Sequence, residues 1–181
     1  MKYFILLTIA MLFQQAQVIN LKEYYCGEGV IFDGKAIFPF KRTNFNKNYT
    51  PTINEVKKGE DFLFNNYYEY EINILNHFKL DKSTIKGKLR KSENVQKKFK
   101  NYNRQYVSYI NNENETILYI VLLNFSNKKD AGIYFEGWKE SVLVGTGDFY
   151  YENQKIFIIN LTKNKFIYEV VGMDEDGKTI K

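Results

Sequence analysis

The chain has 181 residues, of which 44% are hydrophobic and 26% are charged, and its formal net charge is +5. With only 2 Pro and 1 Cys, this composition excludes a disordered chain, a collagen-like repeat and a disulfide scaffold. Aromatic residues make up 17% of the chain, a fraction that favours half-buried strands over an all-helical bundle. We therefore expect a single α+β domain over residues 17–172.

The N-terminus has the pattern of a secretory signal peptide. A basic residue, Lys2, precedes an uncharged apolar run over Phe4–Phe13, and a small residue follows at Ala16. We predict cleavage after Ala16, which makes residues 1–16 a signal peptide and the protein secreted or periplasmic. The apolar run is shorter than the roughly 20 residues of a bilayer crossing, so no transmembrane helix is expected after cleavage. An uncleaved anchor is the alternative.

Cys26 and His77 each occur alone, since the chain has one cysteine and one histidine. We interpret Cys26 as a small buried or inert residue, with an intermolecular disulfide as the alternative. Neither residue lies in a sequence setting that indicates a Cys–His nucleophile pair. No catalytic, metal-binding or cofactor-binding motif is present elsewhere. We therefore predict that the protein is not an enzyme and uses no cofactor.

The first part of the mature chain predicts a hairpin and then a helix. The segments Val30–Phe32 and Lys35–Phe38 flank an Asp-Gly pair, which favours a tight hairpin turn. Thr50 is expected to cap a helix whose first turn contains Pro51. Apolar residues then recur at helical spacing, which predicts a helix over residues 51–70.

The segment from Lys79 to Arg104 differs from the rest in charge. It holds ten basic and two acidic residues, and so it accounts for the positive charge of the whole protein. We interpret residues 79–104 as a basic connector that attracts an anionic partner such as a lipid headgroup, an acidic glycan or an acidic protein face. A solvated connector without a binding role is the alternative.

The last part is rich in strand-forming residues. Residues 104–110 and 116–125 should pair as antiparallel strands across a polar turn. Further strand candidates are residues 133–135, 142–144, 149–151, 155–160 and 165–171. The fold expected from these elements is α+β, with one main helix packed on a curled antiparallel sheet of about 4–6 strands and an N-terminal hairpin. Residues 173–181 are expected to form a flexible tail.

Candidate partner-binding residues combine the basic segment with aromatic rings that carry a polar tip. They are Lys86, Lys88, Arg90, Lys91, Lys97, Lys98, Lys100, Arg104, Tyr106 and Trp138. Trp138 is the best single candidate for an exposed contact, because Gly and Lys flank it. Alternation along residues 104–110 leaves either face of that strand as the outward one.

Several segments resemble small exported proteins of Bacteroidota. They are Tyr49–Thr52 at the start of a helix, the strands Asn103–Asn111 and Ile117–Ile120, and a Trp-Lys pair with a Gly-rich turn before a terminal hairpin. The resemblance extends from Tyr49 to Gly172 and implies no catalytic residue. The order of one helix followed by antiparallel hairpins is also similar to cystatin-like and NTF2-like architectures, which include inhibitors, binding modules and enzymes.

Export, the absence of catalytic motifs and the aromatic and basic residues together predict an exported domain that binds a macromolecule without catalysis. The expected partner is another protein or an anionic envelope surface. The alternative is a pocket for a small ligand or glycan, in which case enzyme activity stays open. Nucleic acid is not expected as a partner because of export, despite the sequence pI of 9.0.

Overall fold

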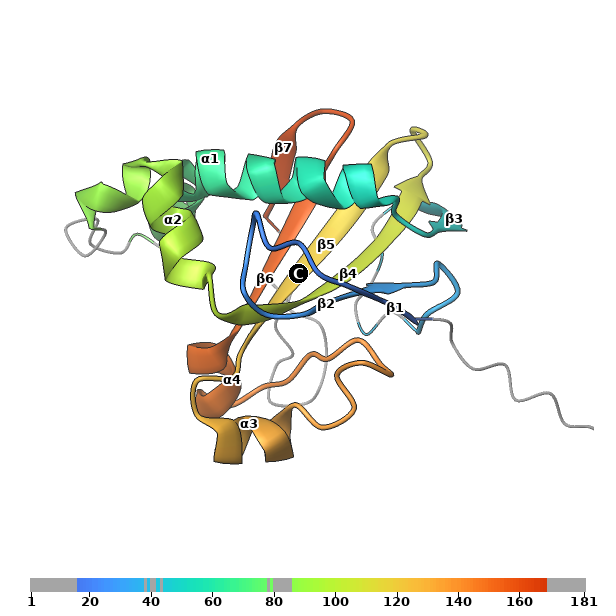
Figure 1. Ribbon diagram of the computed structural model, residues 1–181. Coiled ribbons are helices and arrows are strands. Elements are labelled where there is room, and N and C mark those ends of the chain that lie inside the picture. Colours follow the sequence, from blue (N-terminus) through green and yellow to red (C-terminus); the bar gives the residue numbers. More distant parts are fainter. Residues whose placement is uncertain are drawn as a thin grey trace, which may run out of the picture.

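The protein has an α+β fold in which a long helix packs on an open, mixed sheet of seven strands (Figure 1). The structure, a computed structural model, describes residues 16–37, 39, 42, 44–77, 79 and 86–168. Its elements in chain order are β1 (Ala16–Ile19), β2 (Gly29–Phe32), β3 (Phe45–Tyr49), α1 (Ile53–His77), η2 (Gly87–Arg90), α2 (Ser92–Phe99), β4 (Tyr102–Asn111), β5 (Thr116–Asn124), α3 (Lys128–Tyr134), α4 (Asp148–Asn153), β6 (Gln154–Asn160) and β7 (Lys165–Ile167).

The strand order is β1-β2-β4-β5-β6-β7, and β3 also pairs with β4. β4, β5 and β6 form the antiparallel centre, as predicted for the first two of these strands. β2 and β3 share the remaining edge of β4, with β2 parallel to residues 104–106 and β3 antiparallel to residues 108–111. The sheet is therefore larger than predicted and is mixed, because β2 runs parallel to β4.

The N-terminal hairpin exists, but its strands differ from the predicted pair. β1 pairs with β2 in a register that places Ala16 opposite Phe32 and Ile19 opposite Gly29. After β2, the amide of Ala36 donates to the carbonyl of Asp33 in a turn, and residues 35–37 form no second strand. The predicted strand over residues 35–38 is therefore wrong for residues 35–37, and Phe38 lies outside the described residues.

The long helix α1 starts with a capping box. The Thr52 hydroxyl accepts from the amide of Glu55 at 3.3 Å, and the Glu55 carboxylate accepts from the amide of Thr52 at 2.9 Å. Thr50, the predicted cap, instead accepts from the amide of Gly34 at 2.8 Å. The helix begins at Ile53, two residues later than predicted, and extends to His77.

Gly59 brings α1 into close contact with the sheet. A Cβ atom at this position would lie 2.5 Å from Leu118 Cδ2 of β5, so only glycine fits without a shift. The core on this side also contains residues from β2, β4, β6 and α2. Its largest fully buried members are Tyr25, Tyr67, Tyr106, Phe99, Phe157 and Leu63.

The opposite face of the sheet is covered by α3, α4 and the chain between them, at the bottom of Figure 1. Asn127 caps α3 by accepting from the amide of Asp130. The strands predicted at 133–135 and 149–151 are wrong, since α3 ends at Tyr134 and α4 contains residues 149–151. Residues 142–144 form no strand either, although Val142 is buried against the sheet.

The basic segment is more ordered than a connector. Within residues 79–104, η2 and α2 are helical and β4 begins at Tyr102. Lys82 lies outside the described residues. Val95 and Phe99 of α2 are fully buried, and this apolar face fixes the helix against α1. The prediction of a simple connector is therefore corrected for residues 86–104.

Several predictions concern parts of the chain at its two ends. Of the predicted signal peptide only Ala16 is described, as the first residue of β1. The tail over residues 173–181 lies outside the described residues. Among the helices of the described part, none is long and apolar enough to cross a membrane.

Candidate functional site: a pocket with four lysines

Four of the predicted partner-binding lysines line one pocket where α1, η2 and α2 contact one another. The pocket has a volume of about 540 Å³, within the range of roughly 300–1,000 Å³ that is usual for small-molecule sites. We call it the four-lysine pocket, and its lining is Lys86, Lys88, Lys97, Lys98, Glu71, Leu75, Leu89 and Asn94. The sequence predicted these lysines as candidates, and the structure places them around a shared space.

The packing of α2 on α1 sets the directions of Lys97 and Lys98, which both line the pocket. Phe99 packs edge-on against Tyr67 of α1, with ring centroids 5.2 Å apart. Because side chains four positions apart share a helix face, Val95 and Phe99 occupy the buried side of α2. Lys97 then projects from the opposite side, and Lys98 lies at the flank of the buried side.

Two hydrogen bonds connect η2 to its neighbours. Asn94 Nδ2 of α2 donates to the carbonyl oxygen of Lys88 at 2.7 Å. Arg90 Nη2 donates to the hydroxyl of Tyr68 on α1 at 3.1 Å, and its guanidinium lies 4.8 Å from the centre of that ring. The short helix that carries Lys88 is therefore held by both α1 and α2. Arg90 itself serves this contact and does not line the pocket.

The ammonium group of Lys98 lies against aromatic rings. Its Nζ donates to the hydroxyl of Tyr67 at 2.6 Å and lies 4.7 Å from the centre of that ring and 5.1 Å from the centre of the Phe99 ring. Although Lys98 is exposed as a residue, burial of the ammonium lowers its pKa. Lys98 thus presents a partly desolvated positive charge to the pocket.

None of the four lysines forms an ion pair within the described part of the chain. The described ion pairs involve Lys57, Arg104, Lys139 and Lys163. Glu71 is the one carboxylate in the described lining, so the lining has a net charge of +3 when all five groups are ionised. The pocket therefore has uncompensated positive charge, which is the local property needed to bind an anion.

Three further candidates lie at the surface outside this pocket. Lys91 and Lys100 are exposed and flank the two ends of α2. Trp138 is half-buried on the far face of the sheet, where its ring packs against Phe125 with centroids 5.7 Å apart and Lys139 lies 5.3 Å from its centre. The structure does not bring Trp138 together with the four lysines.

The remaining candidates, Arg104 and Tyr106, are fully buried. Arg104 Nε donates to Glu60 Oε1 at 3.2 Å, and the hydroxyl of Tyr106 donates to the same oxygen at 2.8 Å. The Arg104 guanidinium also lies 4.5 Å from the centre of the Tyr25 ring. Both side chains bind Glu60 of α1 to the sheet and are inaccessible to a surface partner, which corrects their assignment as partner contacts.

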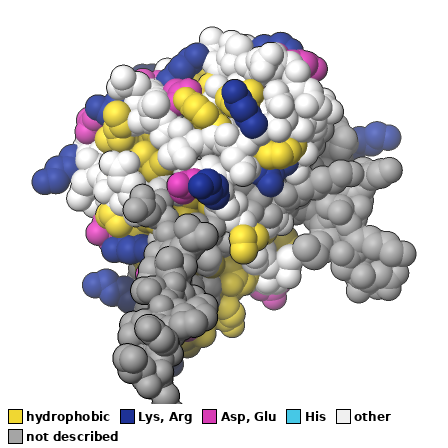
Figure 2. All heavy atoms as spheres, turned by 90° about the vertical axis from the view of Figure 1, so that its right-hand side faces the viewer, with side chains coloured by type: hydrophobic (Ala, Val, Ile, Leu, Met, Phe, Trp, Pro, Cys, Tyr) yellow, Lys and Arg dark blue, Asp and Glu magenta, His cyan; other side chains and the backbone are white. Residues whose placement is uncertain are grey.

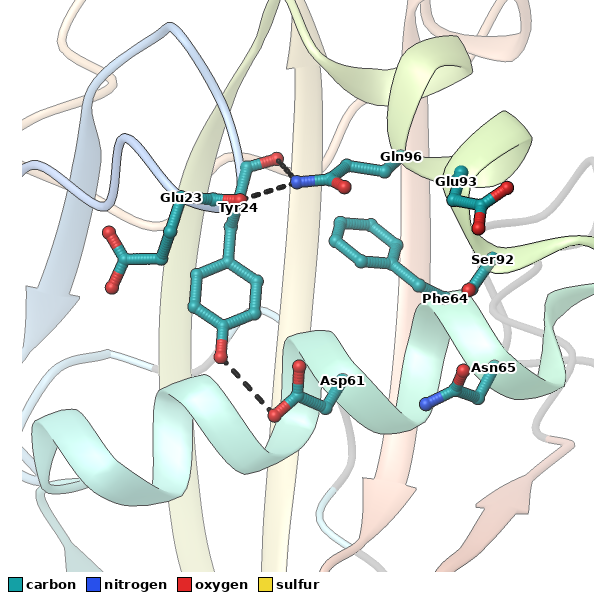
Figure 3. Close-up of a pocket in the computed structure, with 8 residues that line it drawn as sticks. All are labelled: Glu23, Tyr24, Asp61, Phe64, Asn65, Ser92, Glu93 and Gln96. Carbon is teal, nitrogen blue, oxygen red and sulfur yellow. Dashed lines mark hydrogen bonds between the residues drawn. The ribbon is translucent and has the colours of Figure 1, made fainter.

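A second hollow, of about 290 Å³, lies along the other side of α2 and contains carboxylates (Figure 3). Its acidic residues are Glu23, Asp61 and Glu93, which come from the β1–β2 connection, α1 and α2. Tyr24 donates to Asp61 at 3.2 Å, and Gln96 Nε2 donates to the carbonyl of Tyr24 at 3.2 Å. Desolvation and the charge of Asp61 raise the pKa of Tyr24 to about 12, so this phenol is protonated at neutral pH.

The described residues show no arrangement typical of a metal centre. No group of three or more His, Cys, Asp and Glu side chains in the described ranges is placed to hold an ion. Cys26 is exposed and unpaired with another cysteine, so its interpretation as a buried residue is wrong. The side chain of His77 lies outside the described residues.

Sequence reasoning missed the residues that complete the four-lysine pocket. Leu75 and Glu71 lie on α1 beyond residue 70, where the predicted helix ended. Leu89 and Asn94 lie inside the basic segment and were not distinguished from a solvated connector. A helical pattern was present in Val95 and Phe99, which are four positions apart.

Comparisons of this chain with protein-family models, with curated proteins and with solved structures find no match. The resemblance to small exported proteins of Bacteroidota and to cystatin-like or NTF2-like architectures therefore stays a prediction.

Proposed function

We propose that this protein is an exported, non-catalytic binding protein that takes an anionic small molecule into the four-lysine pocket. One observation carries the proposal: Lys86, Lys88, Lys97 and Lys98 converge on one cavity without an ion-pair partner among the described residues. Export rests on the signal-peptide pattern of residues 1–16.

The concentration of lysines contrasts with the opposite side of the molecule. There, around β1 and β3, basic and acidic side chains are scattered among polar and hydrophobic ones (Figure 2). Charges of both signs dispersed in this way give only a weak net field, whereas a hollow lined by four lysines and one carboxylate has a net positive charge that concentrates the potential. The four-lysine pocket is therefore better suited to bind an anion than the surface around β1 and β3.

The geometry supports a small ligand better than the macromolecular partner predicted from the sequence. Two of the candidates, Arg104 and Tyr106, are buried, and Trp138 lies on the other face of the sheet. What is left is a cavity with the volume of a small-molecule site. The proposal thus adopts the alternative of a ligand pocket and leaves enzyme activity out.

Inorganic pyrophosphate is a suitable first probe, because it is a compact anion without an apolar part. We expect it to shift the backbone amide resonances of residues 86–98 and of Leu75 in a titration of the mature chain followed by NMR. Binding should weaken as salt is raised, since the charges are accessible to solvent. Absence of shifts at these residues at low salt would overturn the proposal.

The matched variants are Lys97→Gln/Lys98→Gln and Lys129→Gln/Lys165→Gln. Both remove two positive charges, but Lys129 and Lys165 lie on α3 and β7, away from the pocket lining. Pyrophosphate binding should fall at least about fivefold in the first variant and stay within about twofold in the second. Equal losses in both would indicate a response to net charge alone and would contradict a site at the pocket.

A further inference from the structure

We infer that the ligand of the four-lysine pocket is amphipathic, with a compact anionic head and an apolar chain, as in a monoalkyl phosphate or a fatty acid. This inference rests on the proposed function and specifies the chemical class of its ligand. It follows from the apolar part of the lining, from the size of the pocket and from the surroundings of Lys98.

Two leucines provide the apolar part of the pocket. Leu75 comes from the second half of α1 and Leu89 from η2, and both are half-buried. Leu89 also packs against the main hydrophobic core between α1 and the sheet. A ligand chain lying on these side chains would cover apolar surface that is now partly in water, which is favourable by roughly 25 cal/mol for each Å² removed from water.

The pocket is larger than a compact anion requires. Its volume of about 540 Å³ is many times the share of one water molecule in the liquid, which is about 30 Å³. A phosphate or carboxylate group bound by lysines would fill only part of it. The remaining space is lined by Leu75, Leu89 and the aliphatic parts of the lysines, which suit an alkyl chain.

The surroundings of Lys98 favour an anion that excludes water. Its ammonium lies against the rings of Tyr67 and Phe99 and donates to the Tyr67 hydroxyl. Two of its three N–H groups therefore have no acceptor among the described residues. A charge-assisted hydrogen bond is stronger where the local dielectric constant is low. An alkyl chain that covers the pocket would exclude water and so lower the local dielectric constant further.

Glu71 sets a limit on the ligand. As the one carboxylate in the described lining, it repels a second anionic group placed near it, and it acts electrostatically on Lys98. A ligand with one compact head and an uncharged chain avoids this repulsion. A chain of repeated negative charges, such as an acidic peptide, does not.

The test compares octyl phosphate with inorganic phosphate, octyl glucoside and octyltrimethylammonium at concentrations where all are monomeric. Calorimetry on the mature chain should give a dissociation constant for octyl phosphate at least about tenfold below that of inorganic phosphate, a difference of about 1.4 kcal/mol. The neutral and cationic octyl compounds should bind at least about tenfold more weakly than octyl phosphate.

Each other result has a definite meaning. Equal affinity for octyl phosphate and inorganic phosphate would overturn the amphipathic ligand and leave the anion site intact. Equal affinity for all three octyl compounds would overturn the anion site as well. Binding to phosphatidylglycerol vesicles or to a glutamate oligomer that octyl phosphate does not displace would overturn both in favour of a macromolecular partner.

Protein variants distinguish the contribution of the apolar chain to binding from that of the anionic head. Leu75→Asn/Leu89→Asn should weaken octyl phosphate at least about fivefold while inorganic phosphate changes less than twofold. Ile133→Asn removes an aliphatic side chain that is 63% exposed on α3, and it should leave both ligands unchanged. If the double leucine variant unfolds, Lys98→Gln provides the second measurement, because it should weaken both phosphates and leave the octyl glucoside affinity unchanged.

Discussion

Two groups of basic residues from one charged segment have opposite roles in the structure. Arg104 is fully buried and binds Glu60, whereas Lys86, Lys88, Lys97 and Lys98 lie around a pocket without an ion-pair partner in the described ranges. A buried charge has to be compensated inside the protein, because an isolated one is strongly unfavourable there. A charge at a pocket can be left for a ligand. The basic segment therefore combines a structural cation with a candidate binding site.

Lys163 and Lys98 also differ in whether the protein itself compensates their charge. Glu115 and Glu113 accept hydrogen bonds from Lys163 and raise its pKa, at distances of 2.5 and 3.0 Å. Lys98 has an aromatic neighbour in place of these carboxylates, and desolvation lowers its pKa. Lys163 forms ion pairs with two carboxylates, whereas Lys98 forms none among the described residues and has only the longer-range charge of Glu71. The following predictions test this difference between compensated and uncompensated charges.

The largest effect is expected from Arg104→Met, which leaves Glu60 buried without its cation. The free energy of unfolding should fall by about 3–5 kcal/mol, as measured by urea denaturation. The double variant Glu60→Leu/Arg104→Met should recover most of this loss, even though Tyr106 loses its acceptor. A loss below about 1 kcal/mol in the single variant would show that Glu60 does not depend on Arg104 for compensation of its charge.

The next effect concerns the close approach of α1 that positions Glu60. Gly59→Ala would place a Cβ atom 2.5 Å from Leu118 Cδ2, and the resulting overpacking should lower the free energy of unfolding by about 1–3 kcal/mol. Gly132→Ala in α3 is the matched control. No heavy atom lies within 4 Å of its added Cβ, so this change should stabilise by about 0.5–1 kcal/mol. Stabilisation by both changes would rule out the close contact at Gly59.

A smaller effect on stability is expected at low pH, where Glu115, the partner of Lys163, takes up a proton. Hydrogen bonds from Lys163, Asn111 and Asn160 lower the pKa of Glu115 from 4.5 to about 2. Its charged form is favoured by folding, so its contribution is present above pH 4.5 and is lost as the pH falls toward 2.

Glu115→Gln should therefore flatten the dependence of the melting temperature on pH between 4.5 and 2. The exposed Glu136→Gln is the control and should leave that dependence as in the parent protein. An unchanged slope in Glu115→Gln would contradict the role of this carboxylate.

The smallest effect on stability is expected from the uncompensated lysines. Lys86→Gln, Lys88→Gln and Lys97→Gln should each change the free energy of unfolding by less than about 0.5 kcal/mol, because these residues are exposed and form no ion pair within the described residues. Their expected consequence is weaker anion binding. A loss above about 1.5 kcal/mol in any of them would show that the fold uses the charge.

The sequence predicted those elements whose pattern is local. β4 and β5 were found because both are long apolar runs separated by a polar turn. α3 and α4 were missed because Ile133 and the aromatic residues 149–151 favour strands by composition, while packing against the far face of the sheet makes them helical. The N-terminal hairpin was assigned to the wrong pair of strands, because Ala16 was interpreted as the cleavage site and residues 17–19 were not recognised as a strand.

The candidate site was predicted in part for a similar reason. A cluster of lysines can be recognised from the sequence alone, so four of the lining residues were predicted as candidates. Whether a basic residue points to the surface or to the core depends on register, and Arg104 faces Glu60 because β4 presents its α1 side at that position. The acidic hollow could not be predicted from the sequence, because Glu23, Asp61 and Glu93 come from three distant segments.

The parallel pairing of β2 with β4 predicts an order of assembly. Gly29 lies opposite Arg104 in the sheet, and neighbouring residues across this pair are 75 positions apart in the chain. β4 and β5 need only a short turn to meet, whereas β2 has to wait until residue 106 has been synthesised. Contacts of such separation form late because closing a long loop costs entropy before any pairing is gained. The first strands to leave the ribosome are thus among the last to join the sheet.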